Sequence, residues 1–287
     1  MKLKHKKIIV TGGSTGLGKE ILKTLIQRGA SVISCSRNLK TLSKTIDELM
    51  KLSIDSSQII KGFECDISNF EETKKFFSNS IIELDGLDVL VNNAGIYGPI
   101  GHSENVDIEL WKKSIDINLL GPFHLCQLAI KYFKPKKSGK IINLSGGGAT
   151  SPLPYISSYA AAKSALVRLT ETLAKEVNSY GIEINAIAPG ALNTRLLDQV
   201  LDAGSENVGN EFYQKALKQK SAGGAPISKG AELCAYLASD DSGKFSGKLI
   251  SAIWDPWENL VKKIENSSSS DIYTLRRIIP EDRGENW

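Results

Sequence analysis

Hydrophobic residues recur along this chain in two alternating patterns. Short apolar runs rich in β-branched residues, typical of buried strands, alternate with longer segments in which apolar residues recur every three or four positions, as on one face of a helix. The first pattern predicts strands at residues 7–11, 31–35, 58–63, 87–92, 140–144, 182–188 and 248–253. The second predicts helices from residue 17 to a stop at Gly29, and at 39–52, 69–84, 107–120, 123–133, 158–179 and 229–239.

Repeated strand–helix–strand units favour a parallel sheet with helices on both faces and right-handed crossovers. We therefore predict an α/β fold, a single Rossmann-type doubly wound domain with about seven parallel strands over residues 1–255. Residues 191–220 are helical in tendency but are interrupted by Gly204 and Gly209, as a mobile flap would be.

A short C-terminal extension, residues 256–287, follows the predicted domain. It comprises a predicted helix at 258–265, a serine-rich linker at 266–271 and a tail at 272–287 that mixes arginines with apolar and aromatic residues. A purely solvating segment has no need of such side chains. We expect the tail to pack on a neighbouring subunit or over the mouth of its own active site.

Composition narrows the function classes. Hydrophobic residues make up 41% and charged residues 24% of the 287 residues, as in ordinary globular proteins, and the net charge of +4 is small. The basic run at residues 2–7 has no interleaved aromatic residues to stack on bases, so nucleic-acid binding is not expected. No apolar run approaches the ~18 residues of a membrane span, and no membrane partner is expected.

The cysteines and histidines show no pattern of a disulfide framework or a metal site. Four cysteines are far apart, mostly within predicted strands or helices, and the three histidines have no ligand spacing. Buried free thiols are typical of a reducing compartment, so we predict a cytoplasmic protein without a bound metal.

In open parallel sheets, ligands bind outside the carboxyl ends of the strands, and a glycine-rich turn lies at the end of the first strand here. It runs from Thr11 to Gly18 and opens into the first helix. Glycines let a backbone approach a pyrophosphate, and the helix N-terminus offers free N–H groups and a positive dipole end to it. The candidate cofactor-binding residues of this turn are Gly12, Ser14, Thr15, Gly16, Leu17 and Gly18.

Four motifs occur in an order that resembles the classical short-chain dehydrogenase/reductase family. The turn has the spacing TGxxxGxG, residues 92–95 read Asn-Asn-Ala-Gly after the fourth strand, a YxxxK pair follows the fifth, and Pro189-Gly190 follows the sixth. The resemblance covers residues 5–255. It implies an NAD(P)-dependent oxidoreductase that transfers a hydride between a nicotinamide cofactor and a carbonyl or secondary alcohol.

The resemblance also implies roles for particular segments. Residues Asn93, Ala94 and Gly95 would line the adenine-ribose side, and Asp66 and Ile67 would contact the adenine. Pro189, Gly190 and Thr194 would hold the nicotinamide carboxamide. The long helices at 107–133 and 158–179 would pair across a two-fold axis, which implies a homodimer or homotetramer.

The end of the second strand distinguishes NAD from NADP. An acidic residue there would accept hydrogen bonds from a ribose 2′-hydroxyl, whereas a basic residue would neutralise a 2′-phosphate. This chain has Ser36 followed by Arg37 and no carboxylate in either place. We predict NADP, with NAD as the alternative.

Tyr159 and Lys163 are the candidate acid–base pair. Residues four apart share a helix face, so the ammonium of Lys163 can lie near the phenol of Tyr159. A tyrosine pKa near ~10 is too high for a proton relay at neutral pH, and we expect the ammonium and a positive nicotinamide ring to lower it. Tyr155 has no lysine four residues after it and is not expected to be the catalytic acid. Asn118 resembles the family asparagine that bends a helix and carries a proton-relay water.

The chain departs from the family pattern at the serine that polarises the substrate carbonyl. That position, thirteen residues before Tyr159, is Gly146. Ser145, one residue earlier, is the predicted replacement, and Thr150 or Ser151 are weaker candidates. If the loop follows the family path, Gly146→Ser would be expected to raise the rate.

The missing serine keeps open a second hypothesis, a cofactor-binding regulatory or scaffold protein with weak catalysis, although Tyr159, Lys163 and Asn118 favour an enzyme. An epimerase or dehydratase of the extended family is a third hypothesis, but the TGxxGxxG spacing of those enzymes is absent. The segments at 147–157 and 191–225 are rich in Gly, Ala, Ser and Asn, which weakly favours a polar, sugar-like small-molecule substrate.

Overall fold

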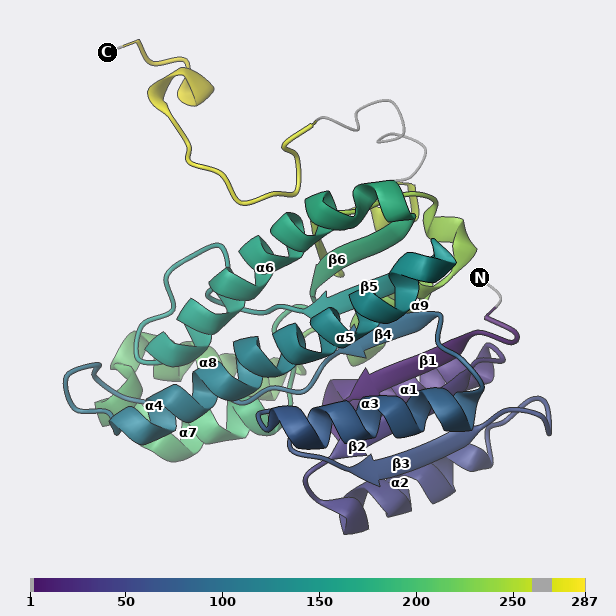
Figure 1. The fold of residues 1–287 in the computed structure, drawn as a ribbon. Helices are drawn as coiled ribbons and strands as arrows, with labels where there is room; N and C mark the ends of the chain where they lie inside the picture. Colours follow the sequence, from purple (N-terminus) through teal and green to yellow (C-terminus); the bar gives the residue numbers. More distant parts are fainter. Residues whose placement is uncertain (1–2, 260–269, 287) are drawn as a thin grey trace.

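A seven-stranded parallel sheet forms the centre of the protein (Figure 1). The computed structural model describes residues 3–259 and 270–286. The strands are β1 (Lys7–Thr11), β2 (Ser31–Ser36), β3 (Ile60–Glu64), β4 (Val89–Asn92), β5 (Gly139–Leu144), β6 (Ile182–Ala188) and β7 (Leu249–Ser251), in the spatial order β3-β2-β1-β4-β5-β6-β7. The helices are α1 (Gly16–Gln27), α2 (Leu39–Met50), α3 (Phe70–Leu84), α4 (Ile108–Ile115), α5 (Gly121–Lys136), α6 (Ser157–Val177), α7 (Arg195–Val208), α8 (Asn210–Ala222) and α9 (Ile227–Ala238).

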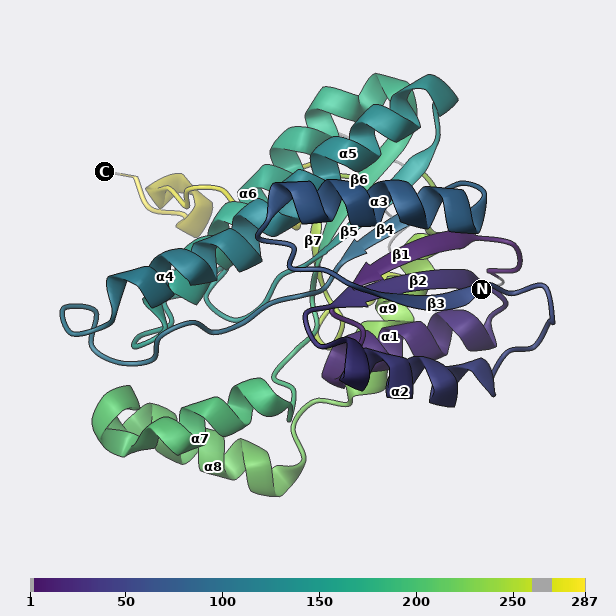
Figure 2. The same ribbon diagram turned by 60° about the horizontal axis from the view of Figure 1, so that its bottom comes forward.

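Helices cover both faces of the sheet, as Figure 2 shows. Helices α1, α2 and α9 lie on one face, and α3, α5 and α6 lie on the other. Strand β1 shows why both faces need cover: Ile8 and Val10 belong to the first core cluster, whereas Ile9 between them belongs to the second. Side chains alternate across a strand, so a strand that is apolar at every position must be buried on both sides.

The strand order reverses beside β1, which pairs with β2 on one side and β4 on the other. In a doubly wound sheet this is the point where a crevice opens at the carboxyl ends of the strands. The predicted fold is therefore confirmed, and the glycine-rich turn and the Asn-Asn-Ala-Gly segment leave the sheet at this switch point.

The predicted helices at 107–120 and 123–133 are joined in the structure. A π-helical segment, Asp116–Leu120, connects α4 directly to α5. The amide of Asn118 inside it donates to the Ser114 carbonyl oxygen at 2.9 Å and to the Ile96 carbonyl oxygen at 2.8 Å. The prediction of a break after residue 120 was wrong, because a wider helical turn takes the place of a loop.

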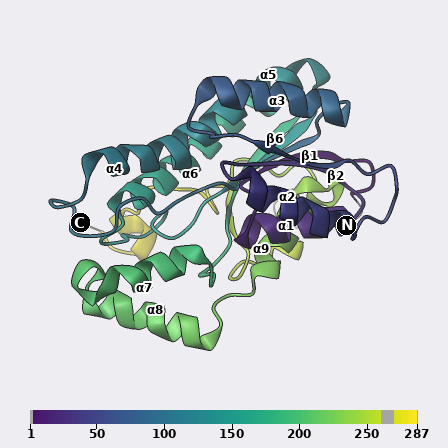
Figure 3. The ribbon, with the colours of Figure 1, turned by 90° about the horizontal axis from the view of Figure 1, so that it is seen from below.

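Helices α7 and α8 pack on each other as a hairpin, which lies at the bottom of the view in Figure 3. Gly209 separates the two helices with a φ of 71°, and Gly204 makes a kink inside α7 with a φ of 76°. Both glycines adopt the left-handed half of the backbone map that other residues disfavour. The two interruptions predicted from the sequence are confirmed.

The described part of the C-terminal extension packs on its own chain. The Lys248 ammonium donates to the carbonyl oxygens of Ser270 (2.5 Å) and Ile272 (2.9 Å), and the Leu249 N–H donates to the Tyr273 carbonyl oxygen at 2.8 Å. These bonds cover the open edge of β7, and an exposed edge would otherwise invite pairing with another chain. The predicted helix at 258–265 and most of the serine-rich linker lie outside the described residues.

A second set of contacts joins the tail to α6. The Leu275 N–H donates to a carboxylate oxygen of Glu171 at 2.6 Å, and the Leu275 side chain packs against Val167 and Ala149. Residues 270–275 thus contact their own chain, and the predicted contact of the tail with a neighbouring subunit stays a prediction. They bind the outer side of α6 and the sheet edge, because Glu171 and Lys248 present charged groups there that need partners.

We expect truncation after Ser270 to lower the free energy of unfolding by about 2–4 kcal/mol, because it strips hydrogen-bond partners from the buried Lys248, from Glu171 and from the β7 edge. Urea denaturation of the truncated and full-length chains measures the difference. The control is truncation after Gly284, which leaves all these contacts in place. Equal unfolding free energies for the two truncated chains would show that the tail contacts do not stabilise the fold.

Candidate active site

The glycine-rich turn packs directly against the segment that follows β4. A Cβ on Gly12, whose φ is +70°, would lie 2.8 Å from the Ala94 Cα, and a Cβ on Gly18 would lie 2.1 Å from the Gly12 carbonyl oxygen. No larger side chain fits at either position. The Asn93 amide holds the two segments together by donating to the carbonyl oxygens of Thr11 (2.9 Å) and Gly12 (3.1 Å).

The N-terminus of α1 is open at this turn. Its N-cap residue, Thr15, makes no side-chain capping hydrogen bond, so the N–H groups of the first turn point out of the helix end unsatisfied by a cap. Thr194, the N-cap residue of α7, lies on the other side: its methyl carbon is 3.7 Å from the position of a Cβ on Gly16. The structure thus brings the predicted phosphate turn and the predicted carboxamide segment together.

The end of β2 presents an unpaired cation. Arg37 is exposed, and the described residues provide it with no ion pair. The Ser36 hydroxyl lies beside the turn, 3.4 Å from the Ser14 hydroxyl, and accepts a hydrogen bond from the Asn38 N–H at 3.2 Å. A guanidinium without a protein partner beside the phosphate turn is free to bind an anionic group.

The end of β3 holds the predicted adenine residues. Burial opposes ionisation of Asp66, but a hydrogen bond from the Ser68 hydroxyl (2.6 Å) and the Lys113 ammonium (3.2 Å) outweigh it and lower the pKa of the carboxyl group. Ile67 is buried beside it. The carboxylate is therefore charged at neutral pH and held in one place.

Tyr159 and Lys163 share the inner face of α6, and both are buried. The Lys163 ammonium nitrogen lies 5.6 Å from the centre of the Tyr159 ring and donates to the Leu144 carbonyl oxygen at 2.7 Å. The main-chain oxygen at the end of β5 thus fixes the ammonium next to the ring. The pairing predicted from the four-residue spacing is present in the structure.

The pKa values of this pair differ from the expectation for the tyrosine. Burial, with a further contribution from Tyr97, raises the pKa of Tyr159 well above its ordinary value, and burial lowers the pKa of Lys163 to about 8. The groups of the chain alone therefore do not lower the tyrosine pKa, because desolvation of a phenolate outweighs the attraction of an ammonium that also binds a carbonyl. At neutral pH, Tyr159 is a neutral phenol and Lys163 is mostly protonated.

Asn118 and Gly95 complete the inner end of the site. The side-chain amide oxygen of Asn118 accepts from the Ile96 N–H at 3.1 Å. A Cβ on Gly95 would lie 2.8 Å from that oxygen and 3.6 Å from the Lys163 ammonium nitrogen. Gly95 therefore lies between Asn118 and Lys163, and the structure brings together three residues that are far apart in sequence.

Ser145 is the buried hydroxyl at the end of β5. Only 4% of the residue is exposed, its N–H donates to the Ile187 carbonyl oxygen at 2.8 Å, and its side-chain oxygen has no hydrogen-bond partner. A buried polar atom without a partner is costly and is characteristic of functional sites. The weaker candidates, Thr150 and Ser151, are exposed.

Gly146 is in contact with the Tyr159 hydroxyl. A Cβ at this position would lie 2.2 Å from the Tyr159 hydroxyl oxygen and 3.2 Å from the ring carbon that carries it. The space that a serine would need is therefore filled by the tyrosine. The loop does not follow the path on which Gly146→Ser would be expected to raise the rate.

Tyr97 is a site residue that the sequence reasoning missed. Its ring lies edge-on to the Tyr159 ring, with centroids 4.8 Å apart and an interplanar angle of 90°. The available signal was its position, two residues after the Asn-Asn-Ala-Gly segment. Tyr155, in contrast, contacts His102, with ring centroids 5.1 Å apart, as expected of a residue outside the acid–base pair.

The residues fit a dinucleotide with a nicotinamide. The turn leaves no room for a Cβ at Gly12 or Gly18, and the α1 N-terminus has no side-chain cap. The unpartnered Ser145 oxygen belongs to the residue before Gly146, which lies against the Tyr159 hydroxyl. The described residues contain no cluster of His, Cys, Asp and Glu that could hold a metal ion.

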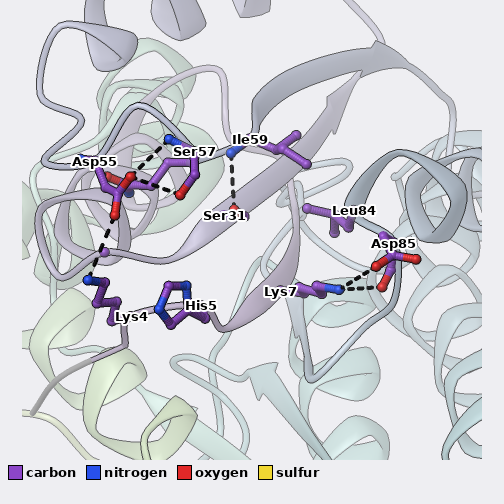
Figure 4. A pocket seen from close by; sticks show the side chains of 11 residues that line it. Lys4, His5, Lys7, Ser31, Asp55, Ser57, Ile59, Leu84 and Asp85 are labelled. Atoms are coloured by element: carbon purple, nitrogen blue, oxygen red, sulfur yellow. Dashed lines mark hydrogen bonds and ion pairs between the residues drawn. The ribbon is translucent and has the colours of Figure 1, made fainter.

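A hollow of about 240 Å³ lies at the opposite edge of the sheet, where β1, β2 and β3 begin (Figure 4). Its two lysines are paired with carboxylates: Lys4 lies 3.9 Å from Asp55, and Lys7 lies 3.3 Å from Asp85. Because ligands of such folds bind at the carboxyl ends of the strands, we assign this hollow no role in the site.

Comparison with known proteins points to one family. The family model described as short chain dehydrogenase matches residues 6–204. The chain is 36% identical over 193 residues to a 3beta-hydroxysteroid dehydrogenase 1 of Eggerthella lenta, covering 67% of this chain and 72% of the relative. It is 32% identical to dehydrogenase/reductase SDR family member 4 of Caenorhabditis elegans, covering 87% of this chain and 94% of the relative.

A solved structure also superposes on this fold. A variant of actinorhodin polyketide ketoreductase, solved with NADPH, superposes with a TM-score of 0.78 at 25% identity and covers 90% of this chain and 100% of its own. None of the helices in residues 3–259 and 270–286 combines the length and the hydropathy that a membrane span requires.

Proposed function

Because the chain belongs to the short-chain dehydrogenase family, and is therefore an NAD(P)-dependent oxidoreductase that acts on CH–OH groups of small molecules, we propose that Tyr159, Lys163, Ser145 and Asn118 carry out its chemistry. One observation supports this most directly. The phenol of Tyr159 is buried between the Lys163 ammonium and Gly146, the residue after Ser145, at the carboxyl end of β5.

When bound, the nicotinamide supplies or accepts the hydride. In the reducing direction Tyr159 donates its proton to the carbonyl oxygen as the C–H bond forms, so that C=O becomes CH–OH. Tyr159 is protonated at neutral pH, as this step requires, but burial makes its phenol a weak acid. A positively charged nicotinamide ring, when bound, would lower the pKa of Tyr159 toward the working pH. The Lys163 ammonium lies close enough to offset the charge of the phenolate that remains.

Ser145 is the proposed donor of a hydrogen bond to the substrate oxygen. Its hydroxyl is buried and unpartnered, and a donor held ready in a dry site is more effective than one surrounded by water. Asn118 is proposed to hold a water that returns protons to the site, with its side chain fixed by the backbone of Ile96 and Ser114.

The remaining predicted residues are proposed to bind the cofactor. The phosphates would lie on the turn and the α1 N-terminus, the adenine between Asp66, Ile67 and the segment Asn93–Gly95, and the carboxamide on Pro189, Gly190 and Thr194. The exposed, unpaired Arg37 next to Ser36 supports a preference for NADP.

We expect the protein to bind NADPH more tightly than NADH, and Arg37→Asp to reverse the preference by removing the cation and adding a 2′-hydroxyl acceptor. Fluorescence titration of both reduced cofactors measures the two dissociation constants. The matched control is Lys40→Asp, which makes the same charge change at an exposed residue of α2. Tighter binding of NADH by the unmodified chain would contradict the assignment.

Further proposals concern the setting of the enzyme. We propose a cytoplasmic enzyme, because all four cysteines are free and buried.

We propose a homodimer or homotetramer, with residues 1–255 as the catalytic domain and 256–287 as an extension. Exposed apolar side chains on α5 and its junction, Phe123 (36%) and Leu120 (41%), support the paired helices. A regulatory protein with weak catalysis is not favoured, since the curated relatives described above are named dehydrogenases.

A further inference from the structure

An apolar wall surrounds the Tyr159 phenol on the substrate side. Tyr159 belongs to a cluster with Ile156, Leu197 and Val208, which are at most 6% exposed, and Tyr97 packs against it. The expectation of a polar substrate rested on the amino-acid composition of the whole segments 147–157 and 191–225. The side chains of those segments that cluster with Tyr159 are the large apolar ones, contributed by the loop before α6 and by the hairpin of α7 and α8.

A hollow of about 340 Å³ continues this wall away from Tyr159. Ile100 lines the hollow and also packs against the Tyr159 cluster, and Asn207, on its rim, directly precedes Val208 of that cluster. The hollow has an apolar side, with Val106 and Leu110, and Leu110 is 56% exposed although it is apolar. An exposed large apolar residue inside a concave surface is characteristic of a ligand site.

The rim of the hollow carries unused hydrogen-bonding groups. The Asn207 amide nitrogen donates to the Ala203 carbonyl oxygen at 2.9 Å, and its amide oxygen has no hydrogen-bond partner among the described residues. Asn105 and His102 also line the hollow. This part of the surface can therefore bind a hydroxyl or similar polar group.

Tyr155 holds the walls of the hollow together. Its carbonyl oxygen accepts from the Gly101 N–H at 2.9 Å, its ring packs on His102, and its hydroxyl lies 2.8 Å from the position of a Cβ on Gly209. Tyr155 adopts a φ of 68°, which is strained for a residue with a side chain. Three segments that are far apart in sequence are thus fixed to one another, as in a pre-formed binding site.

We propose that this hollow is the outer part of the substrate site and that the substrate is an elongated molecule, with an apolar ring beside the reacting carbonyl and a hydrogen-bonding group at its far end. The reacting carbon lies at Tyr159, the apolar body contacts Tyr97 and Ile100, and the distal polar group reaches Asn207. The inference rests on the proposed function, because it takes Tyr159 as the reacting centre.

Three ketones of increasing length test it with NADPH: cyclohexanone, 4-phenylcyclohexanone and 4-(4-hydroxyphenyl)cyclohexanone. We expect kcat/KM to rise at least ~10-fold from the first to the second, because the added ring leaves water. We expect a further increase of about 3–10-fold for the third, from one hydrogen bond to Asn207.

Two variants locate the effect. Asn207→Ala is expected to remove the advantage of the hydroxyphenyl ketone over the phenyl ketone, and Leu110→Trp, which fills the hollow, to reduce the advantage of both over cyclohexanone. Turnover of cyclohexanone should remain within about twofold, since neither residue contacts Tyr159. The controls are Glu206→Gln and Ile108→Trp, exposed neighbours on the same helices that do not line the hollow.

Equal kcat/KM values for the three ketones, or equal effects of the variants and their controls, would overturn the proposal while leaving the proposed chemistry intact. If no ketone is reduced, the proposed chemistry fails instead. Calorimetric titration of the hydroxyphenyl ketone into the Tyr159→Phe protein with NADP⁺ then tests, by binding alone, whether the hollow holds the ketone. Asn207→Ala in that background should weaken ketone binding about 3–10-fold. Unchanged ketone binding would refute the proposed role of the hollow.

Discussion

Tyr159→Phe is expected to lower kcat by about 10²–10⁴-fold while leaving the dissociation constant for NADPH unchanged within about twofold. The substitution removes one hydroxyl from a buried ring and keeps the contacts of that ring with Tyr97 and the apolar wall. Folding is therefore preserved and the proton donor is lost. Steady-state reduction of a ketone by NADPH gives kcat, and fluorescence titration gives the cofactor affinity.

Tyr155→Phe is the matched control for this change. Tyr155 lies four residues earlier and contacts His102 and Gly209, not Lys163. Its loss of a hydroxyl should alter KM more than kcat, because the residue organises the outer walls of the site. A larger fall in kcat for Tyr155→Phe than for Tyr159→Phe would show that the acid has been misplaced.

Ser145→Ala is expected to lower kcat by about 10²–10³-fold, the usual cost of removing one donor to a developing oxyanion. The side-chain oxygen has no partner among the residues that the structure describes, so its removal breaks no hydrogen bond there and should not destabilise the fold. Parallel measurement of kcat and of the urea midpoint separates the two effects. Full activity in Ser145→Ala would transfer the role to Thr150, Ser151 or a water.

Moving the serine one residue along is a sharper test of the same donor. Gly146→Ser, alone or with Ser145→Ala, places a Cβ within 2.2 Å of the present position of the Tyr159 hydroxyl oxygen. The tyrosine must shift, and a shift of the proton donor by about an ångström is sufficient to cost ~10²-fold in rate. Restoration of activity by Gly146→Ser in the Ser145→Ala background would show instead that the loop can adopt the family arrangement.

The amino-acid sequence by itself determined the fold and the pairing of Tyr159 with Lys163 on one face of α6. The alternation of buried strands with amphipathic helices predicts a doubly wound sheet, because a strand such as β1, apolar on both sides, must have helices on both faces. The pairing of Tyr159 with Lys163 could be predicted in the same way, since residues four apart in a helix lie on one face, here of α6. The turn at Gly12–Gly18 could be predicted as a candidate cofactor-binding segment because it lies between β1 and α1.

Only the tertiary structure decided what surrounds these residues. The filled space at Gly146, the unpartnered hydroxyl of Ser145 and the raised pKa of Tyr159 each depend on how β5 and its loop pack against α6. The apolar wall requires the α7–α8 hairpin to lie over Tyr159, and the tail contacts require Glu171 and Lys248 to face the sheet edge. Local periodicity specifies which face of an element is buried, but the partner that buries it is contributed by segments far away in the chain, and desolvation depends on all of them together.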